Sequence, residues 1–371
     1  MPQTPLIFAD THTIITSAES HALGYDPMFK NISDPYGREM NYPRIWQCLF
    51  WLPINSDHLV ILAGIFILLF FVGIFLFLKT IDTQTALFLG AVTFSPSAIF
   101  GLQSGNNDLV IFFVVALALR LGYRSKLWGS IAMFFAAILK VFPIFGLAQL
   151  LTEDKRDFWR ILMPLAALFL AYCWISLDDF RQIYSVTPRG RSGAYGVYVL
   201  PMMIEKTLQK WTIFPDLRTW IIAAAPIFFY GIAGLVFLIS LYALANKNTS
   251  SRPVAGIHIS PFRAGACIYI GSFLLASNWN YRMIFLIFTI PQLFAWLSIA
   301  DIRLLRILRI TLVGILFSCW SMFIQGIFGS YIFILDEIAN WVVFSGLIYL
   351  FLASLPNWLF DTLLYLVPIR R

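Results

Sequence analysis

The chain has 371 residues, of which 60% are hydrophobic and only 12% are charged, and its mean hydropathy is +0.79. A soluble domain of that size cannot bury so much apolar surface, so the composition indicates a polytopic membrane protein. The formal net charge of +7 would suggest nucleic-acid binding in a soluble protein, but the basic residues here lie mostly in short connections between apolar runs. In that position they set orientation in the membrane, and no nucleic-acid partner is expected.

The first polar segment, residues 1–56, is expected to lie on the extracytoplasmic side and to begin with a short amphipathic helix. Ile14, Ile15 and Ala18 fall on or near one side of this helix, which breaks at Gly24. Such a helix is able to lie in the plane of the membrane interface. Asp10 precedes it, and an aspartate at that place is commonly an N-cap.

Two further aspartates of this segment, Asp26 and Asp34, each precede a proline, and turn formation explains them.

Nine apolar runs follow that approach the roughly 20 residues needed to cross a bilayer. They are residues 57–78, 84–101, 107–122, 158–177, 219–245, 259–277, 283–300, 310–328 and 337–355. No soluble domain of ordinary size is left over. We therefore expect residues 1–371 to form a single all-α transmembrane domain, with its spans within 57–355 and a second extracytoplasmic loop at 178–218.

Residues 127–151 form a further apolar block, which contains Lys140 and Pro143. Basic clusters lie on both sides of it, and further ones follow later in the chain: Arg120, Arg124 and Lys126; Lys155, Arg156 and Arg160; Arg303, Arg306 and Arg309; Arg370 and Arg371. The positive-inside rule places all of them in the cytoplasm. One complete crossing by 127–151 would put its two flanking clusters on opposite sides.

The conflict disappears if the block enters the membrane and returns. Pro143 can supply the break, because it removes a backbone donor and clashes with the preceding turn. We predict two half-helices, roughly 127–139 and 142–151, with Lys140 near the junction on the extracytoplasmic side. The alternative is that Lys140 snorkels from an ordinary helix.

Polar side chains expected on this same face form the candidate site. Gln103, Asn106 and Asn107, at the mouth of two helices, suit sugar hydroxyls, although a polar hairpin turn explains them as well. In the stretch SNWNYR, Arg282 suits a phosphate, with Asn280 beside it. In the loop at 178–218, Arg189 and Arg191 suit an anionic headgroup, or simply lie near lipid phosphates. The four histidines show no spacing typical of a metal site, so no metal is expected.

Several of these motifs, in their order and spacing, resemble glycosyltransferase family 87, mainly over residues 10–150. They are Asp10 followed by Ala18, then Gly24-Tyr25-Asp26-Pro27, Asn41-Tyr42-Pro43, Gly101-Leu102-Gln103-Ser104-Gly105-Asn106 and Lys140-Val141-Phe142-Pro143. The resemblance implies a transmembrane helix bundle of the GT-C type, related to polyprenyl-phosphomannose-dependent mannosyltransferases. Members normally have a first span before the aspartate loop, whereas this sequence opens almost directly in that loop, so the first family span is expected to be missing.

The resemblance further implies a hexosyltransferase of a bacterial plasma membrane with a lipid-linked donor. It would take a sugar, mannose in most of the family, from a polyprenyl-phosphate donor to a lipid or glycan acceptor on the extracytoplasmic face. Asp10 would be the base. Direct displacement by one base would invert the anomeric centre, and no metal or other cofactor is expected where enough fixed cations surround the leaving phosphate. From the residues themselves we assign the donor phosphate to Lys140 with Arg282, or with Arg189 and Arg191. The sugar or acceptor is assigned to Gln103, Asn106, Asn107, Asn280 and Tyr42.

Two other functions remain open at this point. Many spans and a broken helix with an intramembrane charge also suit a transporter or lipid flippase. The third is a structural membrane subunit without activity.

Overall fold

The structure is a computed structural model of the chain, and it describes residues 7–152, 154–188, 190, 193–209, 215–246, 256–275, 277–329 and 331–365. The chain folds into two compact units. The first comprises Met1–Thr80, Ile99–Leu150 and Arg156–Pro188, and the second comprises Ile81–Ala98, Leu151–Lys155 and Arg189–Arg371.

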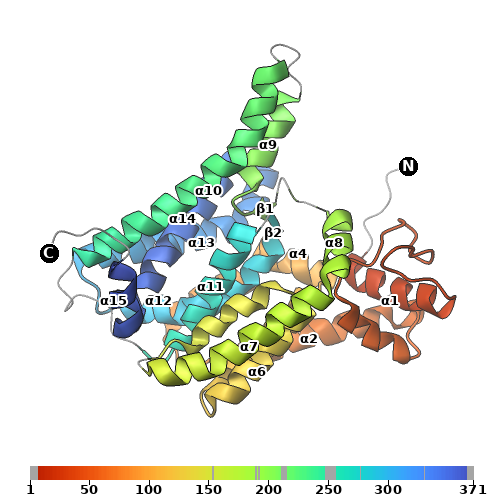
Figure 1. The fold of residues 1–371 in the computed structure, drawn as a ribbon, viewed down its shortest axis with the longest axis horizontal. Coiled ribbons are helices and arrows are strands. Elements are labelled where there is room, and N and C mark those ends of the chain that lie inside the picture. Colours follow the sequence, from red (N-terminus) through yellow and green to blue (C-terminus); the bar gives the residue numbers. More distant parts are fainter. Residues whose placement is uncertain are drawn as a thin grey trace. The chain divides into compact units, whose positions relative to one another are not determined.

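The first unit is helical throughout its regular structure (Figure 1). Its elements are α1 (Ala9–Ala22), η1 (Arg44–Trp51), η2 (Ser56–His58), α2 (Leu59–Phe77), α5 (Asp108–Gly122), α6 (Lys126–Leu139), η3 (Phe142–Leu150), α7 (Lys155–Ile175) and α8 (Leu177–Val186), where η marks a 3₁₀-helix. α4 (Pro96–Ser104) begins in residues of the second unit and ends in the first.

The second unit is also built from helices, with one two-residue strand pair. Its elements are α3 (Thr83–Thr93), β1 (Ala194–Tyr195), α9 (Val199–Leu208), α10 (Pro215–Ala245), α11 (Ile259–Leu275), β2 (Asn278–Trp279), η5 (Asn280–Thr289), α12 (Ile290–Leu297), α13 (Ile302–Phe328), α14 (Ile332–Ala353) and α15 (Asn357–Leu364). β1 and β2 pair antiparallel, with Ala194 opposite Trp279. The segment expected as a long loop, 178–218, thus contains α8, β1 and α9.

The long apolar helices establish an all-α membrane protein. Five helical segments of the described residues are long and apolar enough to cross a bilayer: Ser56–Phe77, Lys155–Ile175, Leu217–Ala245, Ile302–Phe328 and Ile332–Ala353. α3 and α4, bent by 50° at their junction, make a sixth if they count as one span.

The expected nine full spans are not confirmed. α5 has 15 residues and α11 has 17, so both are shorter than a typical crossing. The run 283–300 is divided between the 3₁₀-helix η5 and the eight-residue α12.

The block 127–151 turns back on itself, as the charge pattern predicted. α6 ends at Leu139 and η3 begins at Phe142, with Lys140 in an extended conformation between them. Near the other end of the pair, Gln149 Nε2 donates to Gly129 O at 3.1 Å, so η3 runs back beside α6. A straight helix would separate those two residues by about 30 Å.

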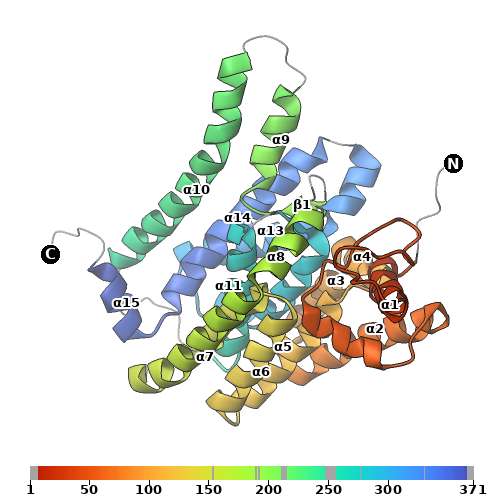
Figure 2. The same ribbon diagram turned by 45° about the vertical axis from the view of Figure 1, so that its right-hand side comes forward.

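The two basic connections that flank this hairpin lie together. Lys126 Nζ is 3.3 Å from Asp157 Oδ2, which joins the start of α6 to the first turn of α7. Figure 2 shows α5, α6 and α7 side by side in this unit. The arrangement places both clusters at one end of the helices and Lys140 at the other, as the positive-inside argument requires.

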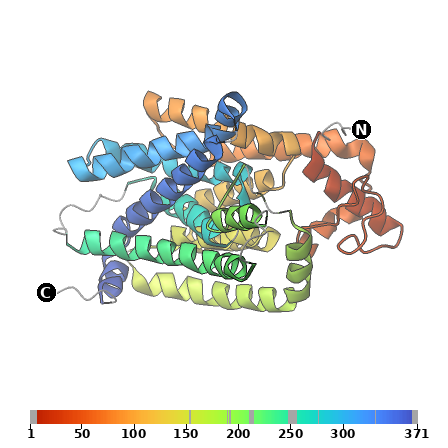
Figure 3. The ribbon, with the colours of Figure 1, turned by 90° about the horizontal axis from the view of Figure 1, so that it is seen from above.

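The second unit is packed around α11, α13 and α14. The rings of Phe273 and Phe344 stack with centroids 4.3 Å apart, and Trp341 meets Phe273 edge-on at 5.0 Å. α10, the long green helix, lies against α14 (Figure 3).

Helix α1 ends at Ala22, before the predicted break at Gly24, but it begins at Ala9, so Asp10 lies inside it rather than before it, and the helix is buried within the protein. Ile14 and Ile15 are buried, and so are Thr16 and Ser20 on the opposite side of the helix. The hydroxyl groups are satisfied by hydrogen bonds, such as that from Ser17 Oγ to Thr13 O at 2.6 Å. Because serine and threonine can bond back to the carbonyl four residues earlier, a helix rich in them can be buried without unpaired polar groups.

Candidate functional site

The start of α1 is fastened to the turn between α4 and α5. Phe8 N donates to Gln103 O at 2.9 Å, and Thr11 Oγ1 donates to Gly105 O at 2.6 Å. Gly105 has a φ of +57°, and a Cβ there would overlap Thr11 Oγ1. The contact therefore requires glycine, which has no Cβ and adopts a positive φ readily. Phe8 is itself left-handed, at φ 59°, which for a bulky residue costs on the order of 1–3 kcal/mol.

Asp10 lies in the first turn of α1 and is not its N-cap, since the N-cap is Phe8 and the side chain of Phe8 cannot accept a hydrogen bond. Instead, Asp10 Oδ2 accepts a hydrogen bond of 2.6 Å from Asn106 Nδ2. Its other oxygen, Oδ1, accepts none from the residues that the structure describes, and the side chain is partly exposed.

The surroundings of Asp10 adjust its proton affinity in opposite directions. Burial raises the pKa of its carboxyl group above 3.8, while the hydrogen bond from Asn106 and the charges of Lys140 and Arg38 oppose the rise. A carboxylate with a raised pKa is a better proton acceptor than a fully solvated one. One oxygen of the Asp10 carboxylate is thus held by the amide of Asn106, and the other is available to accept a proton.

Lys140 is paired with an acidic residue within the protein. Its Nζ lies 2.6 Å from Asp108 Oδ1 and 2.9 Å from Asn107 Oδ1. The side chain of Asp108 is 1% exposed and that of Lys140 is 17% exposed. The predicted partner of Lys140 was a lipid phosphate, and its pairing with Asp108 was not predicted. Opposite charges in neighbouring apolar segments commonly pair. The presence of Asp108 in one such segment and Lys140 in the next could therefore have predicted this ion pair.

Tyr42, Asn107 and Gln103 take different positions around this pair. Tyr42 is buried, and its ring centroid lies 5.7 Å from Lys140 Nζ, within the range of a cation–π contact. Asn107 Nδ2 is buried and has no hydrogen-bond partner among the described residues. The side chain of Gln103 is exposed, and its backbone carbonyl makes the contact with α1.

An ion pair behind Asp10 was not expected from the sequence, which marked Asp34 only as a turn residue. Asp34 does form that turn, since its Oδ1 accepts from Tyr36 N at 2.9 Å. It is also fully buried and bonded to Arg38, whose Nη1 donates to Ala9 O at 3.0 Å. The pair thereby supports the backbone next to Asp10. Burial opposes ionisation, but the bonds from Arg38 and Tyr36 hold the pKa of Asp34 below 3.8.

The first unit therefore brings together Asp10, Asn106, Asn107, Lys140 and Tyr42, with Gln103 at the edge. Arg282 and Asn280 belong to the second unit. There Arg282 donates to Asn278 Oδ1, and Asn280 Nδ2 lies 3.5 Å from Asp336 Oδ2. The predicted phosphate ligands Arg189 and Arg191 lie outside the described residues.

A second group of polar residues, which the sequence did not predict, lies in the second unit. It consists of Asp336, Glu337 and Asn340 on α14 together with Tyr269 on α11, and all four are buried. The predicted last span began at residue 337, just after Asp336, but α14 already begins at Ile332. Residues 332–336 are apolar except for Asp336, so beginning the span after that acid made the predicted helix too short.

No known family model matches the sequence, and no curated protein and no solved structure is similar to the chain. The resemblance to glycosyltransferase family 87 stays a prediction.

Proposed function

We propose that the protein is an inverting membrane glycosyltransferase. It transfers a hexose, mannose in the first instance, from a polyprenyl-phosphate donor to a lipid or glycan acceptor on the extracytoplasmic face of a bacterial plasma membrane. The observation that supports this most is the geometry of Asp10: a partly exposed carboxylate with one oxygen held by Asn106 and the other open. The ammonium group of Lys140 and the buried amide of Asn107 add polar groups beside it.

The proposed step uses Asp10 as a general base. Its open oxygen takes the proton of an acceptor hydroxyl, whose oxygen then forms a bond to the anomeric carbon of the sugar. The bond between that carbon and the phosphate oxygen breaks, and polyprenyl phosphate leaves with the electron pair. A single displacement inverts the anomeric centre. A positioned base of this kind typically contributes about 10²–10⁴-fold in rate.

The charges in the first unit refine the predicted role of Lys140. Asp10, Asp108 and Lys140 together carry a net charge of −1 when all are ionised, so Lys140 alone does not make a site for a phosphate dianion. In this proposal, Lys140 holds Asn107 and Asp108 in place and lowers the negative potential around Asp10. The donor phosphate then needs further cations, for which Arg282, Arg189 and Arg191 remain the candidates.

The experiment is transfer of radiolabelled mannose from polyprenyl-phosphomannose into a total lipid extract by purified full-length protein. Asp10→Asn keeps the size and the contact with Asn106 but removes the base, so transfer should fall about 10²-fold or more. The matched control is Asp178→Asn, since that carboxylate is 93% exposed and should be dispensable. Near-normal transfer by a folded Asp10→Asn protein would remove the base role.

In the wild-type protein the rate should fall as the pH drops through the pKa of Asp10, because the protonated carboxyl group cannot take a proton. Since burial raises that pKa, the acidic limb of the profile should lie above pH 3.8.

A transporter is the second candidate, and the ion pair between Lys140 and Asp108 at a helix break favours it. Such a protein would move the labelled lipid between the leaflets of a vesicle without changing it. Movement without transfer would select this candidate over the enzyme.

A further inference from the structure

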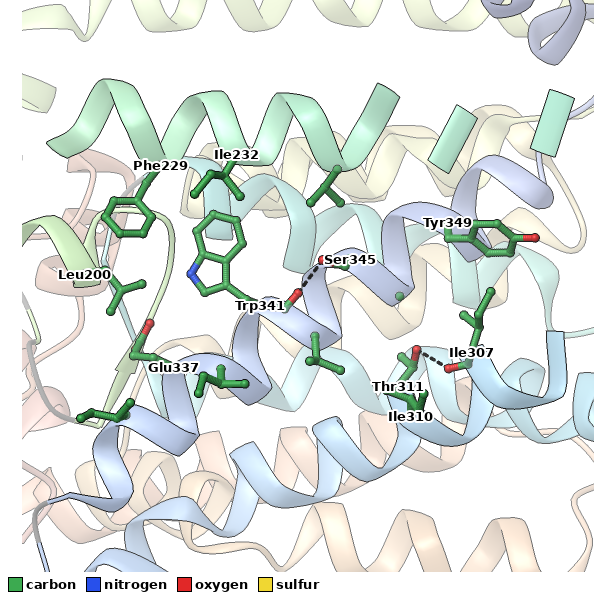
Figure 4. Close-up of a pocket in the computed structure, with 15 residues that line it drawn as sticks. Leu200, Phe229, Ile232, Ile307, Ile310, Thr311, Glu337, Trp341, Ser345 and Tyr349 are labelled. Carbon is green, nitrogen blue, oxygen red and sulfur yellow. Dashed lines mark hydrogen bonds between the residues drawn. The ribbon is translucent and has the colours of Figure 1, made fainter. Parts of the chain in front are cut away.

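The second unit contains a groove that the proposed reaction does not use. It lies between α10, α13 and α14, next to α9, and has a volume of about 780 Å³. Its walls are mostly aliphatic and aromatic, with Phe229 and Ile232 on α10 and Ile307 and Ile310 on α13. Figure 4 shows these side chains facing the same space. A groove of this composition takes an apolar chain.

One wall carries a line of polar or amphipathic side chains. Glu337, Trp341, Ser345 and Tyr349 follow one another at intervals of four residues along α14, and all of them line the groove. Residues at this spacing share one face of a helix. From the first to the last the line extends about 18 Å, so the groove is long enough for a single extended hydrocarbon chain.

Glu337 stands at one end of the line and is chemically unusual. Its residue is 1% exposed, and both carboxyl oxygens lack a hydrogen-bond partner among the described residues. Its neighbour Asp336 differs, because it lies within hydrogen-bond distance of Asn280 and Asn340. A buried polar group without a partner is rare in folded proteins and calls for an explanation.

Trp341 offers the complementary group. Its indole Nε1, a donor only, is also buried without a partner among the described residues. Figure 4 shows Glu337 and Trp341 rising into the groove from α14, with the indole nitrogen on the side of Glu337. The groove thus presents an acceptor and a donor that the described part of the protein leaves unused.

Headgroup chemistry follows from this pair. A hydroxyl group donates one hydrogen bond and accepts another, so it can satisfy Glu337 and Trp341 together. An anionic headgroup would be buried here without a counter-charge, because the described residues that line the groove include no lysine or arginine, and an ammonium group could not accept from the indole. We propose that this groove is a binding site for a neutral, single-chain lipid whose free hydroxyl group is held between Glu337 and Trp341.

The test uses photo-crosslinking of the full-length protein in detergent with 1-hexadecanol that carries a diazirine in its chain. Hexadecanoate with the same diazirine is the comparison, because only its headgroup differs. The alcohol should label peptides of α10, α13 and α14, and unlabelled hexadecanol should compete. Hexadecanoate should label at least about tenfold less at equal concentration.

Three variants separate the headgroup site from general lipid contact. Glu337→Leu removes the acceptor and should weaken competition by hexadecanol about tenfold or more, and Trp341→Phe, which loses only the N–H, should weaken it severalfold. Glu337→Gln keeps an acceptor at the same place, so both labelling by the alcohol and competition by hexadecanol should persist. A protein that merely misfolds would lose both. Asp361→Asn, at an exposed position of α15, is the control.

Equal labelling by the two probes in the wild-type protein would overturn the proposal, since the groove would then only accommodate bulk lipid chains. The same holds if the preference for the alcohol survives in Glu337→Leu.

Discussion

Asp10 illustrates how a single residue's surroundings decide its role. At the start of a helix, an aspartate with no other partner serves as a cap. Here the turn 103–106 is close enough for Asn106 to take the carboxylate, and Phe8 occupies the N-cap position in a left-handed conformation. The sequence indicated both residues but not their contact. The two residues are 96 positions apart in the sequence, and the left-handed turn at Gly105 brings them together. A single sequence does not show that Gly105 needs a positive φ.

Gly105 provides a direct test of this junction. In Gly105→Ala, a Cβ would overlap Thr11 Oγ1 in addition to straining the left-handed backbone. We expect the midpoint of thermal unfolding to fall, with a loss of about 2 kcal/mol or more in the free energy of unfolding. Gly37→Ala is the matched control, because Gly37 has a φ of +64° but nothing within 4 Å of its Cβ position. Equal losses in both variants would show that the contact with Thr11 is unimportant.

Asp34 should make the first unit sensitive to acid. Its pKa is lowered in the folded state, so it contributes stability above pH 3.8 that is lost as the pH falls through the lowered value. Asp34→Asn should lower the free energy of unfolding at pH 7 by about 2 kcal/mol, because it removes a charged partner of Arg38. It should also flatten the decline in stability below pH 4. Unfolding scans from pH 7 to pH 3 measure both effects, and an unchanged slope in the variant would contradict the assignment.

At the level of elements, the hairpin of α6 and η3 is the part of the fold that the sequence predicted best. The basic clusters on both sides of the block, together with Pro143, predicted the position of the break to within one residue. The number of spans was predicted less well, since hydropathy does not distinguish a full crossing from a short buried helix such as α5 or from a 3₁₀ segment such as η5. Both are apolar because they are buried within the protein, whatever their length.

The ion pair at the tip of this hairpin can be dissected with a double-mutant cycle. Lys140→Met leaves Asp108 buried without its cation and should cost about 3–5 kcal/mol in the free energy of unfolding. Asp108→Asn in the same protein should recover most of that loss, because no charge is then left buried. Urea titration of the two single variants and the double variant measures the coupling. Strictly additive losses would show that the pair contributes nothing of its own.

For the whole molecule, membrane sidedness is the property that joins the fold to the proposed function. The contact between Lys126 and Asp157 puts two basic connections at one end of the first unit. The proposed site lies by Lys140, at the other end of α6.

Cysteine labelling can test this arrangement in intact cells. In a background with the exposed Cys48 changed to serine, Arg124→Cys and Asp157→Cys should both resist a membrane-impermeant maleimide until the membrane is permeabilised. Lys30→Cys, in the exposed segment after α1, should react at once. Reaction of Arg124→Cys and Asp157→Cys from opposite sides would rule out a returning hairpin.

The hairpin also constrains how the chain is made. α6 has 14 residues and rises only about 21 Å, so neither α6 nor the shorter η3 can enter the bilayer separately as a complete span. Asp108 is synthesised 32 residues before Lys140 and is costly in hydrocarbon until its cation arrives. Residues 108–150 are therefore expected to leave the insertion machinery together, with Asp108 and Lys140 already paired when they enter the bilayer.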